Sequence, residues 1–238
     1  FVSERGVPDM KIAAGPFMFT SPEQSTCFMG SDYWKGLTDQ LEAKSGLVSI
    51  SWDWYLGDRN IISDKGFAQP GDLRGVKIRI PSDKTWETLF STLGASPTVL
   101  EWSEVYSALT EGVVDAAEAP LTTLLGARLN EAAKTITLTG HYNVPSGFVI
   151  NEKVWDRISE ADRDVIVAEF KTGAAAATAA AVEQGQAARA TLEGEGVKFI
   201  DADHDAYATA VEPFYTKFSE WSDGAVEKTK AAAQACAS

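Results

Sequence analysis

The chain has 238 residues, of which 45% are hydrophobic and 23% are charged, and this is the composition of a globular protein with one large or two small domains. Its formal net charge of −13 at pH 7 argues against a nucleic acid partner, because polyanion binding requires a basic face. Cys27 and Cys236 form no metal-ligand pattern, and we expect free or incidental thiols in preference to a disulfide.

Helix and strand signals alternate along the first 151 residues, and this pattern predicts an α/β architecture. In chain order we predict a helix over 22–44, a strand over 47–60, a connector over 61–74, a strand over 75–80, a helix over 83–93, a strand at 96–102, a helix with Ser103 as its N-cap, a short apolar segment at 113–120, a helix over 121–134, and strands over 135–139 and 144–151.

The longest helix signal runs from about 160 to 193, and it is rich in alanine and free of proline. Ser159 and Asp162 form a capping box at its start. At 1.5 Å per residue such a helix is about 50 Å long, which exceeds the width of a small domain. We therefore predict that it braces two lobes. No apolar run of about 20 residues is present, so no direct membrane insertion is expected. A strand at 197–203 and two helical segments over 204–235 follow.

The stretch "GVKIRIP" at 75–81 places one arginine at the end of a strand. Val76, Ile78 and Ile80 share one face of this strand and Arg79 lies on the other, because side chains alternate with period two. A guanidinium presents a planar fork that fits a carboxylate bidentately. Arg79 is therefore a candidate for anion binding, and a structural ion pair or a solvent-facing charge is the alternative.

No catalytic constellation is found in the sequence, which has no GxSxG, HExxH, P-loop or GxGxxG motif. His141 and His204 are isolated, and we interpret both as structural or solvated. Asp115 and Glu118 lie three residues apart in a strand-to-loop segment, so they do not form a general acid–base pair. We expect neither an enzyme nor a cofactor.

A second candidate for anion binding is Arg59, which follows a strand rich in aromatic residues. Most of the aromatic side chains in these segments are expected in the core, and a minority could stack on a ligand. They are Trp52, Trp54, Tyr55, Trp86, Trp102 and Tyr106.

The region from "GDLRGVKIRIP" through "LGASP" to "SEVYSALTEGVVDAAEAP" resembles the signature of solute receptors of tripartite ATP-independent periplasmic (TRAP) transporters, the DctP type. That family reads approximately D-L-K-G-L-K-I-R-x-P, then L-G-A-x-P, then S-E-V-Y-x-A-L-x-x-G-x-V-D-G-x-E-x-P. The resemblance extends through "INEKVWDRISEADRDVI" and covers essentially the whole chain.

The resemblance implies roles for individual residues. Arg79 matches the arginine that clamps the substrate carboxylate, and Arg59 matches an arginine that lines the cleft. Trp102 matches an aromatic residue that packs on the ligand in a sialic-acid receptor of the family. Ser82 matches a polar position of the pocket.

Two departures from the family pattern concern the pocket. Ala116 replaces the glycine of D-G-x-E-x-P. Ala119 occupies the position before the proline, which is often a ligand-contacting asparagine in the family. With Trp86 nearby, the loss of that amide predicts a more apolar ligand than a sialic acid.

The resemblance implies a two-lobed periplasmic-binding-protein-like α/β fold, with lobe two at 57–144, lobe one at 1–56 and 145–238, and the long helix bracing both. Family members carry further residues before "GPFMFT", so lobe one is expected to be incomplete at its N-terminus and the full-length protein to have a signal peptide. The implied function is that of a periplasmic receptor that binds a small organic carboxylate in an inter-lobe cleft and delivers it to membrane-embedded permease subunits. A ligand-sensing module of the same fold that is not coupled to transport is the alternative.

Overall fold

The computed structural model describes residues 5–143 and 146–237. The chain divides into two compact units, and each of them is assembled from segments that lie far apart in the sequence. Unit 1 contains Phe1–Leu56, Asn143–Ala181 and Phe218–Ser238, and unit 2 contains Gly57–Tyr142 and Val182–Lys217. The fold is of the two-lobed α/β class, as predicted.

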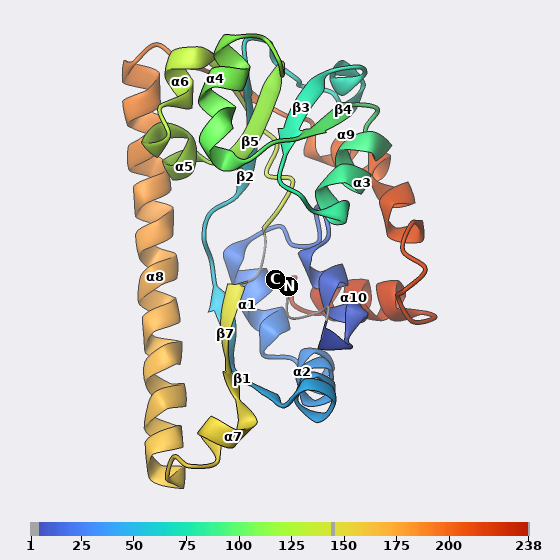
Figure 1. Ribbon diagram of the computed structural model, residues 1–238, viewed down its shortest axis with the longest axis vertical. Coiled ribbons are helices and arrows are strands. Elements are labelled where there is room, and N and C mark those ends of the chain that lie inside the picture. Colours follow the sequence, from blue (N-terminus) through green and yellow to red (C-terminus); the bar gives the residue numbers. More distant parts are fainter. Residues whose placement is uncertain (1–4, 144–145, 238) are drawn as a thin grey trace. The chain divides into compact units, whose positions relative to one another are not determined.

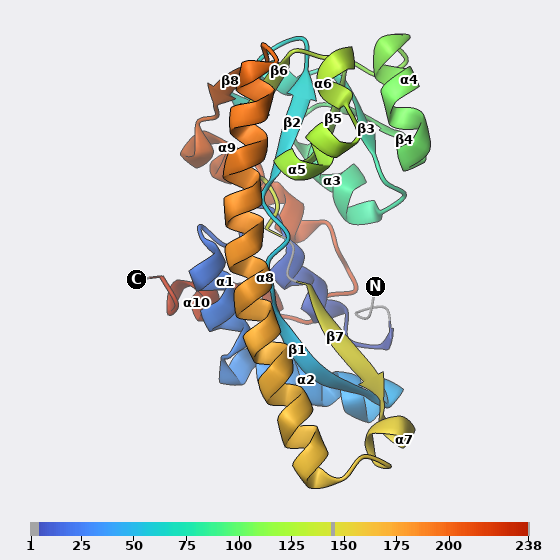
Figure 2. The same cartoon turned by 90° about the vertical axis from the view of Figure 1, so that its left-hand side faces the viewer.

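Unit 1 combines a two-stranded antiparallel sheet with helices (Figure 2). The one helix expected over 22–44 is two helices, because the chain turns at Gly30 and the hydroxyl of Ser31 accepts the N–H of Trp34 as the cap of a new helix. The elements of unit 1 are the 3-10 helix Pro8–Ala14, α1 (Pro22–Met29), α2 (Asp32–Ser45), β1 (Leu47–Trp54), β7 (Ser146–Asn151), α7 (Glu152–Trp155), the first part of α8 (Glu160–Gly194) and α10 (Ala225–Gln234).

The C-terminal helix α10 is attached to α1 and α2. Gln24 donates to the carbonyl oxygen of Ala233 at 2.9 Å, and the hydroxyl groups of Tyr33 and Thr229 lie 2.9 Å apart. Cys27 and Cys236 form a disulfide with a Cα–Cα distance of 5.7 Å. The expectation of free thiols is therefore wrong, because packing of α10 on α1 brings together two cysteines that are 209 residues apart.

Unit 2 is built on a six-stranded mixed sheet of order β4-β3-β5-β2-β6-β8 (Figure 1). Its strands are β2 (Arg59–Ser63), β3 (Lys77–Ile80), β4 (Ser96–Val99), β5 (Ala116–Pro120), β6 (Thr135–Leu138) and β8 (Lys198–Asp201). Its helices are α3 (Lys84–Thr92), α4 (Val105–Thr110), α5 (Leu121–Gly126), α6 (Leu129–Ala132), α9 (His204–Ala210), the end of α8, and 3-10 helices at Pro70–Leu73, Trp102–Glu104 and Glu212–Thr216.

Strand β2 differs from the sequence prediction, which treated 61–74 as a connector. Ile61 and Ile62 are 1% and 0% exposed, and β2 lies between β5 and β6 with antiparallel pairing on both sides. The four residues from Asn60 to Ser63 are all buried, so β2 shows no alternation of buried and exposed positions by which strands are recognised. The four residues Tyr55–Asp58, between β1 and β2, are not strand, and unit 1 passes into unit 2 there.

The two faces of the sheet carry different helices. Figure 1 shows α4, α5 and α6 gathered on one side and α3 and α9 on the other. Ile62, Ala117, Ala119 and Ile136 belong to the apolar core under α4, α5 and α6. Because residues alternate along β5, Glu118 faces the α3 side instead.

Helix α8 contributes residues to both units, with the division after Ala181. The family resemblance implied that all of 145–238 belongs to lobe one, whereas the structure groups 182–217 with unit 2, because β8 pairs in parallel with β6. Among the described residues, α8 is the one helix long and apolar enough to cross a membrane, and length and composition alone are weak evidence of a span.

Candidate ligand-binding site

Arg79 lies near the carboxyl end of β3 with its side chain largely buried. Its Nε and Nη2 groups donate to the carbonyl oxygen of Leu100 at 2.9 and 2.7 Å. Its Cζ atom lies 5.2 Å from the ring centre of Trp102, which is a cation–π distance. Leu100 follows β4, the parallel neighbour of β3, so the chain leaving β4 supplies the acceptor. One edge of the guanidinium is thereby held in place.

The positive charge of Arg79 has no partner of opposite charge in residues 5–143 and 146–237. Arg79 is 5% exposed, and none of the ion pairs among these residues includes it. Burial lowers the pKa of the guanidinium, and the negative charge of Glu118 acts in the opposite direction. An arginine stays protonated at neutral pH all the same. A buried charge of this kind needs an anion.

The other predicted arginine, Arg59, is paired within the protein. Its Nη2 donates to Oε1 of Glu118 at 2.8 Å, and its Nε lies 2.5 Å from Oε2. Arg59 begins β2 and Glu118 lies opposite Ile61 on β5, so the two side chains are diagonal neighbours on one face of the sheet. Glu118 is 0% exposed. The pair is a buried bidentate ion pair.

Trp86 and His141 complete the surroundings of the Glu118 carboxylate. The indole N–H of Trp86 donates to Oε1 at 3.0 Å, and Nε2 of His141 lies 3.2 Å from Oε2. Burial by itself would raise the pKa of the Glu118 carboxyl, but the hydrogen bonds from Arg59 and His141 outweigh it and the pKa is lowered. Glu118 is therefore an anion whose hydrogen bonds come from three side chains.

The two arginines lie on opposite faces of the sheet at one of its ends. The parallel register pairs Ile78 with Ala116, so Arg79 shares its face with Ala117 and Ala119. Glu118 and Arg59 lie on the other face. The ligand sites of α/β sheets are usually found beyond the carboxyl ends of strands, and β3 and β5 both end here.

All six residues predicted for the site belong to unit 2, and four of them form two arginine–tryptophan pairs. Arg79 lies by Trp102, which is 37% exposed, and the Cζ atom of Arg59 lies 5.5 Å from the ring centre of Trp86. Ser82 is exposed between β3 and α3. Ala119 is 1% exposed in the apolar core. Contact of these residues with a ligand stays a prediction.

Sequence reasoning missed Glu118 and His141. Glu118 inside the apolar run Ala116–Pro120 is the available signal, because a carboxylate is buried only with a partner. Asp115, three residues earlier, is exposed and accepts the backbone N–H of Lys77 at 2.9 Å. The two carboxylates thus make separate contacts. Among the described residues, no group of three or more His, Cys, Asp or Glu side chains could hold a metal.

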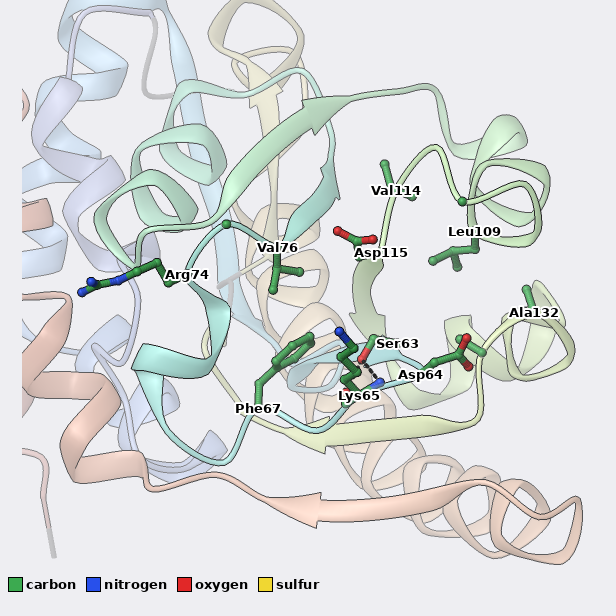
Figure 3. A pocket seen from close by; sticks show the side chains of 13 residues that line it. Ser63, Asp64, Lys65, Phe67, Arg74, Val76, Leu109, Val114, Asp115 and Ala132 are labelled. Atoms are coloured by element: carbon green, nitrogen blue, oxygen red, sulfur yellow. Dashed lines mark hydrogen bonds between the residues drawn. The ribbon is translucent and has the colours of Figure 1, made fainter.

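A cavity of about 370 Å³ opens at the opposite end of the same sheet, where β2 ends at Ser63 (Figure 3). Its carboxylates, Asp64 and Asp115, each accept a backbone N–H. Figure 3 shows the side chain of Arg74 directed away from the cavity. None of the buried polar atoms without a partner among the described residues lies in its lining. The cavity contains none of the six predicted residues, and nothing in it indicates a ligand.

The chain thus has a two-unit α/β fold, with a buried guanidinium at a strand end that has no ionic partner among the described residues. The sequence profile of bacterial extracellular solute-binding protein family 7 (DctP) matches residues 3–221, and the chain belongs to this family. The members are substrate-binding receptors of TRAP transporters and not enzymes. The resemblance seen in the sequence is confirmed.

Three similar proteins illustrate the range of the family. The C4-dicarboxylate-binding periplasmic protein of Rhodobacter capsulatus is 30% identical over 204 residues, which cover 86% of this chain and 57% of that protein. A TRAP solute-binding protein of Fusobacterium nucleatum with bound sn-glycerol-3-phosphate has a TM-score of 0.89 at 28% identity, covering 99% of this chain and 76% of that one. A protein of Actinobacillus succinogenes with bound L-galactonate has a TM-score of 0.87 at 26% identity, covering 98% and 77%.

The chain is shorter than these proteins. It spans 57–62% of the length of three of the relatives that it matches, the proteins from Roseobacter denitrificans, Vibrio cholerae and Rhodobacter capsulatus.

Proposed function

We propose that the protein is the periplasmic solute receptor of a TRAP transporter, which binds a small organic carboxylate through Arg79 and delivers it to the membrane-embedded permease subunits. Family membership supports the receptor role. The relatives named for sialic acid and for C4-dicarboxylates are periplasmic proteins, and both bind carboxylates. The disulfide between Cys27 and Cys236 supports an oxidising compartment such as the periplasm.

The observation that carries the proposal is the unpaired guanidinium of Arg79. The carbonyl of Leu100 occupies the Nε side of the fork, and the remaining N–H groups make no hydrogen bond to a described residue. Those groups can donate two parallel hydrogen bonds to one carboxylate. A hydrogen bond to a charged group contributes about 1.5–3 kcal/mol.

The other predicted residues have supporting roles in this proposal. Trp102 holds the guanidinium by its ring face and presents a partly exposed indole to the ligand. Arg59 and Trp86 line the site on the other face of the sheet. Ser82 offers a hydroxyl, and Ala119 has a methyl group where the family often has an amide.

The test is a thermal-shift screen of organic acids on the full-length protein, because a ligand raises the melting temperature in proportion to RT ln(1 + [L]/Kd). Titration calorimetry with the best acid then compares Arg79→Ala and Arg79→Lys with the wild type. We expect Arg79→Ala to weaken binding about 10- to 150-fold, from the loss of about 1.5–3 kcal/mol. Arg79→Lys keeps the charge but not the fork, so its loss should be smaller.

The matched control is Arg128→Ala, because Arg128 is an exposed arginine of unit 2 whose partner, Glu131, is three residues away. This variant should bind like the wild type. Circular dichroism checks that each variant is folded. Normal affinity in a folded Arg79→Ala variant would contradict the proposal, and so would the absence of binding to any acid in the screen.

A further inference from the structure

The turn before α10 contains the dipeptide Asp223–Gly224, which is the one Asp–Gly pair in the sequence. An aspartate followed by glycine can rearrange without an enzyme, because the backbone nitrogen of the glycine can attack the Cγ atom of the aspartate side chain. Glycine has no side chain to hinder this approach. The sequence contains no Asn–Gly pair, which would react in the same way. Whether Asp223 rearranges therefore depends on how far the fold protects it.

Both residues of this dipeptide lie at the surface of unit 1. Asp223 and Gly224 are exposed. A Cβ atom added to Gly224 would meet no atom beyond its chain neighbours within 4 Å, so the space beside its backbone is open. The carboxylate of Asp223 forms no ion pair and no hydrogen bond with the described residues. The side chain can therefore turn toward the main chain that follows it.

The backbone nitrogen of Gly224 makes no hydrogen bond either. The N–H groups on both sides of it are used, because that of Ser222 donates to Oδ1 of Asp9 at 2.8 Å and that of Ala225 donates to the carbonyl oxygen of Ser222 at 3.0 Å. The N–H of Gly224 donates to no acceptor among the described residues. Gly224 is the N-cap of α10, and the N–H groups at the start of a helix lie outside its hydrogen-bond ladder. No hydrogen bond has to break before this nitrogen reacts.

We propose that Asp223 is a modification site, at which aspartate converts spontaneously to isoaspartate in the folded protein. The nitrogen of Gly224 forms a bond to Cγ of the protonated carboxyl group and releases its proton, and the hydroxyl group of that carboxyl takes up a proton and leaves as water. The product is a five-membered succinimide ring. Water then adds to the ring carbonyl that was the backbone carbonyl of Asp223, and the bond from that carbon to the nitrogen breaks. One water has left and one has entered, and the residue keeps one carboxylate.

The rearrangement adds one carbon atom to the main chain between two fixed points. Before the turn, Trp221 is 9% exposed and stacks on Phe218, with ring centres 4.3 Å apart. After the turn, α10 is tied to α1 by the disulfide of Cys236. The carboxylate of the isoaspartate lies at an exposed position, where a methyltransferase that recognises isoaspartate can transfer a methyl group to it from S-adenosylmethionine. This site lies within unit 1 and does not depend on the ligand or on the function proposed above.

The experiment incubates the oxidised, folded protein for several weeks under mildly acidic conditions, in which part of the carboxyl group is protonated. Trypsin then releases the peptide Phe218–Lys228, in which Asp223 is the one aspartate. Electron-transfer fragmentation distinguishes isoaspartate from aspartate in this peptide, and methyl transfer from S-adenosylmethionine counts isoaspartate independently. A synthetic peptide of the same sequence is incubated beside the protein and gives the rate without a fold.

We expect isoaspartate to form at Asp223 in the folded protein at a rate within about tenfold of the rate in the free peptide, because no local unfolding has to precede the reaction. A rate more than about tenfold below that of the peptide would overturn the proposal, since the fold would then protect the site. Asp223→Glu should form no isomer, because glutamate would need a six-membered ring. An undiminished methyl transfer signal in Asp223→Glu would place the reaction elsewhere and overturn the proposal as well.

The matched control is Ala206→Gly, which creates a second Asp–Gly pair at Asp205. Asp205 is exposed like Asp223, but the N–H of residue 206 donates to Oδ1 of Asp203 at 3.0 Å. In this variant we expect Asp205 to rearrange at least about tenfold more slowly than Asp223 in the same molecule, because its neighbouring nitrogen must first lose that hydrogen bond. Equal rates at the two sites would overturn the role assigned to the N–H of Gly224.

Discussion

Removal of the disulfide should destabilise the protein by several kcal/mol. The change is the double substitution Cys27→Ser with Cys236→Ser, which leaves both side chains small and polar. In the chain-entropy description, a closed loop of 209 residues lowers the entropy of the unfolded chain by an amount equivalent to about 5 kcal/mol at 25 °C. Native disulfides of small secreted domains contribute about 2–5 kcal/mol when measured, so this figure is an upper value.

The expected loss translates into a change in melting temperature that calorimetry resolves easily. For a protein of this size, 1 kcal/mol corresponds to about 2–4 °C, so the double variant should melt about 5–20 °C below the oxidised wild type. Wild-type protein in excess reductant should melt at the same temperature as the double variant, and reductant should have no effect on the variant itself.

The hydrogen bonds that attach α10 to α1 and α2 do not depend on the disulfide. Gln24 and Tyr33 still bond to α10 without the disulfide, so we expect the variant to fold before it is heated. Equal melting temperatures for the oxidised wild type, the reduced wild type and the variant would refute the reasoning, because the loop would then make no measurable contribution to stability.

Two further predictions concern stability in each unit. Gly147→Ala should destabilise unit 1 strongly, because the added Cβ would lie 2.2 Å from the carbonyl oxygen of Ser51. The Cβ of Gly36→Ala meets nothing within 4 Å, so this substitution should stabilise α2 by up to about 1 kcal/mol. Urea unfolding measures the free energy of unfolding of both variants. Acid should destabilise unit 2 in two stages. Burial lowers the pKa of His141 below its ordinary value of 6.5, and the hydrogen bonds of Glu118 lower the pKa of its carboxyl below 4.5. The unfolded chain therefore binds more protons than the folded protein below each value, and stability falls with pH, first below about 6.5 and again below about 4.5. A stability that is constant from pH 7 to 5 would contradict the first stage.

Local patterns of the sequence predicted the position of Arg79 well. Alternation along 75–81 predicted that Ile78 and Ile80 share one face of the strand, and both are 0% exposed. The same alternation set Arg79 on the other face at the strand end. The alanine-rich segment likewise predicted the long helix, which the structure has at Glu160–Gly194. These features depend on backbone geometry that repeats within a few residues, so a short stretch of sequence contains the information.

The partners of these residues were decided by tertiary structure. The acceptor for Arg79 is 21 residues away, the partner of Arg59 is 59 residues away, and the cysteines that form the disulfide are 209 residues apart. β2 was missed because four consecutive residues of this strand are buried and show no alternation. The assignment of 182–217 to unit 2 follows from the pairing of β8 with β6. Strand order and helix packing create such contacts, and no periodic pattern within one segment specifies which distant segment will lie beside it. The sequence alone thus determined that a guanidinium stands at a strand end, and only the tertiary structure decided that Arg79 lacks an anionic partner in the described part of the chain while Arg59 has one.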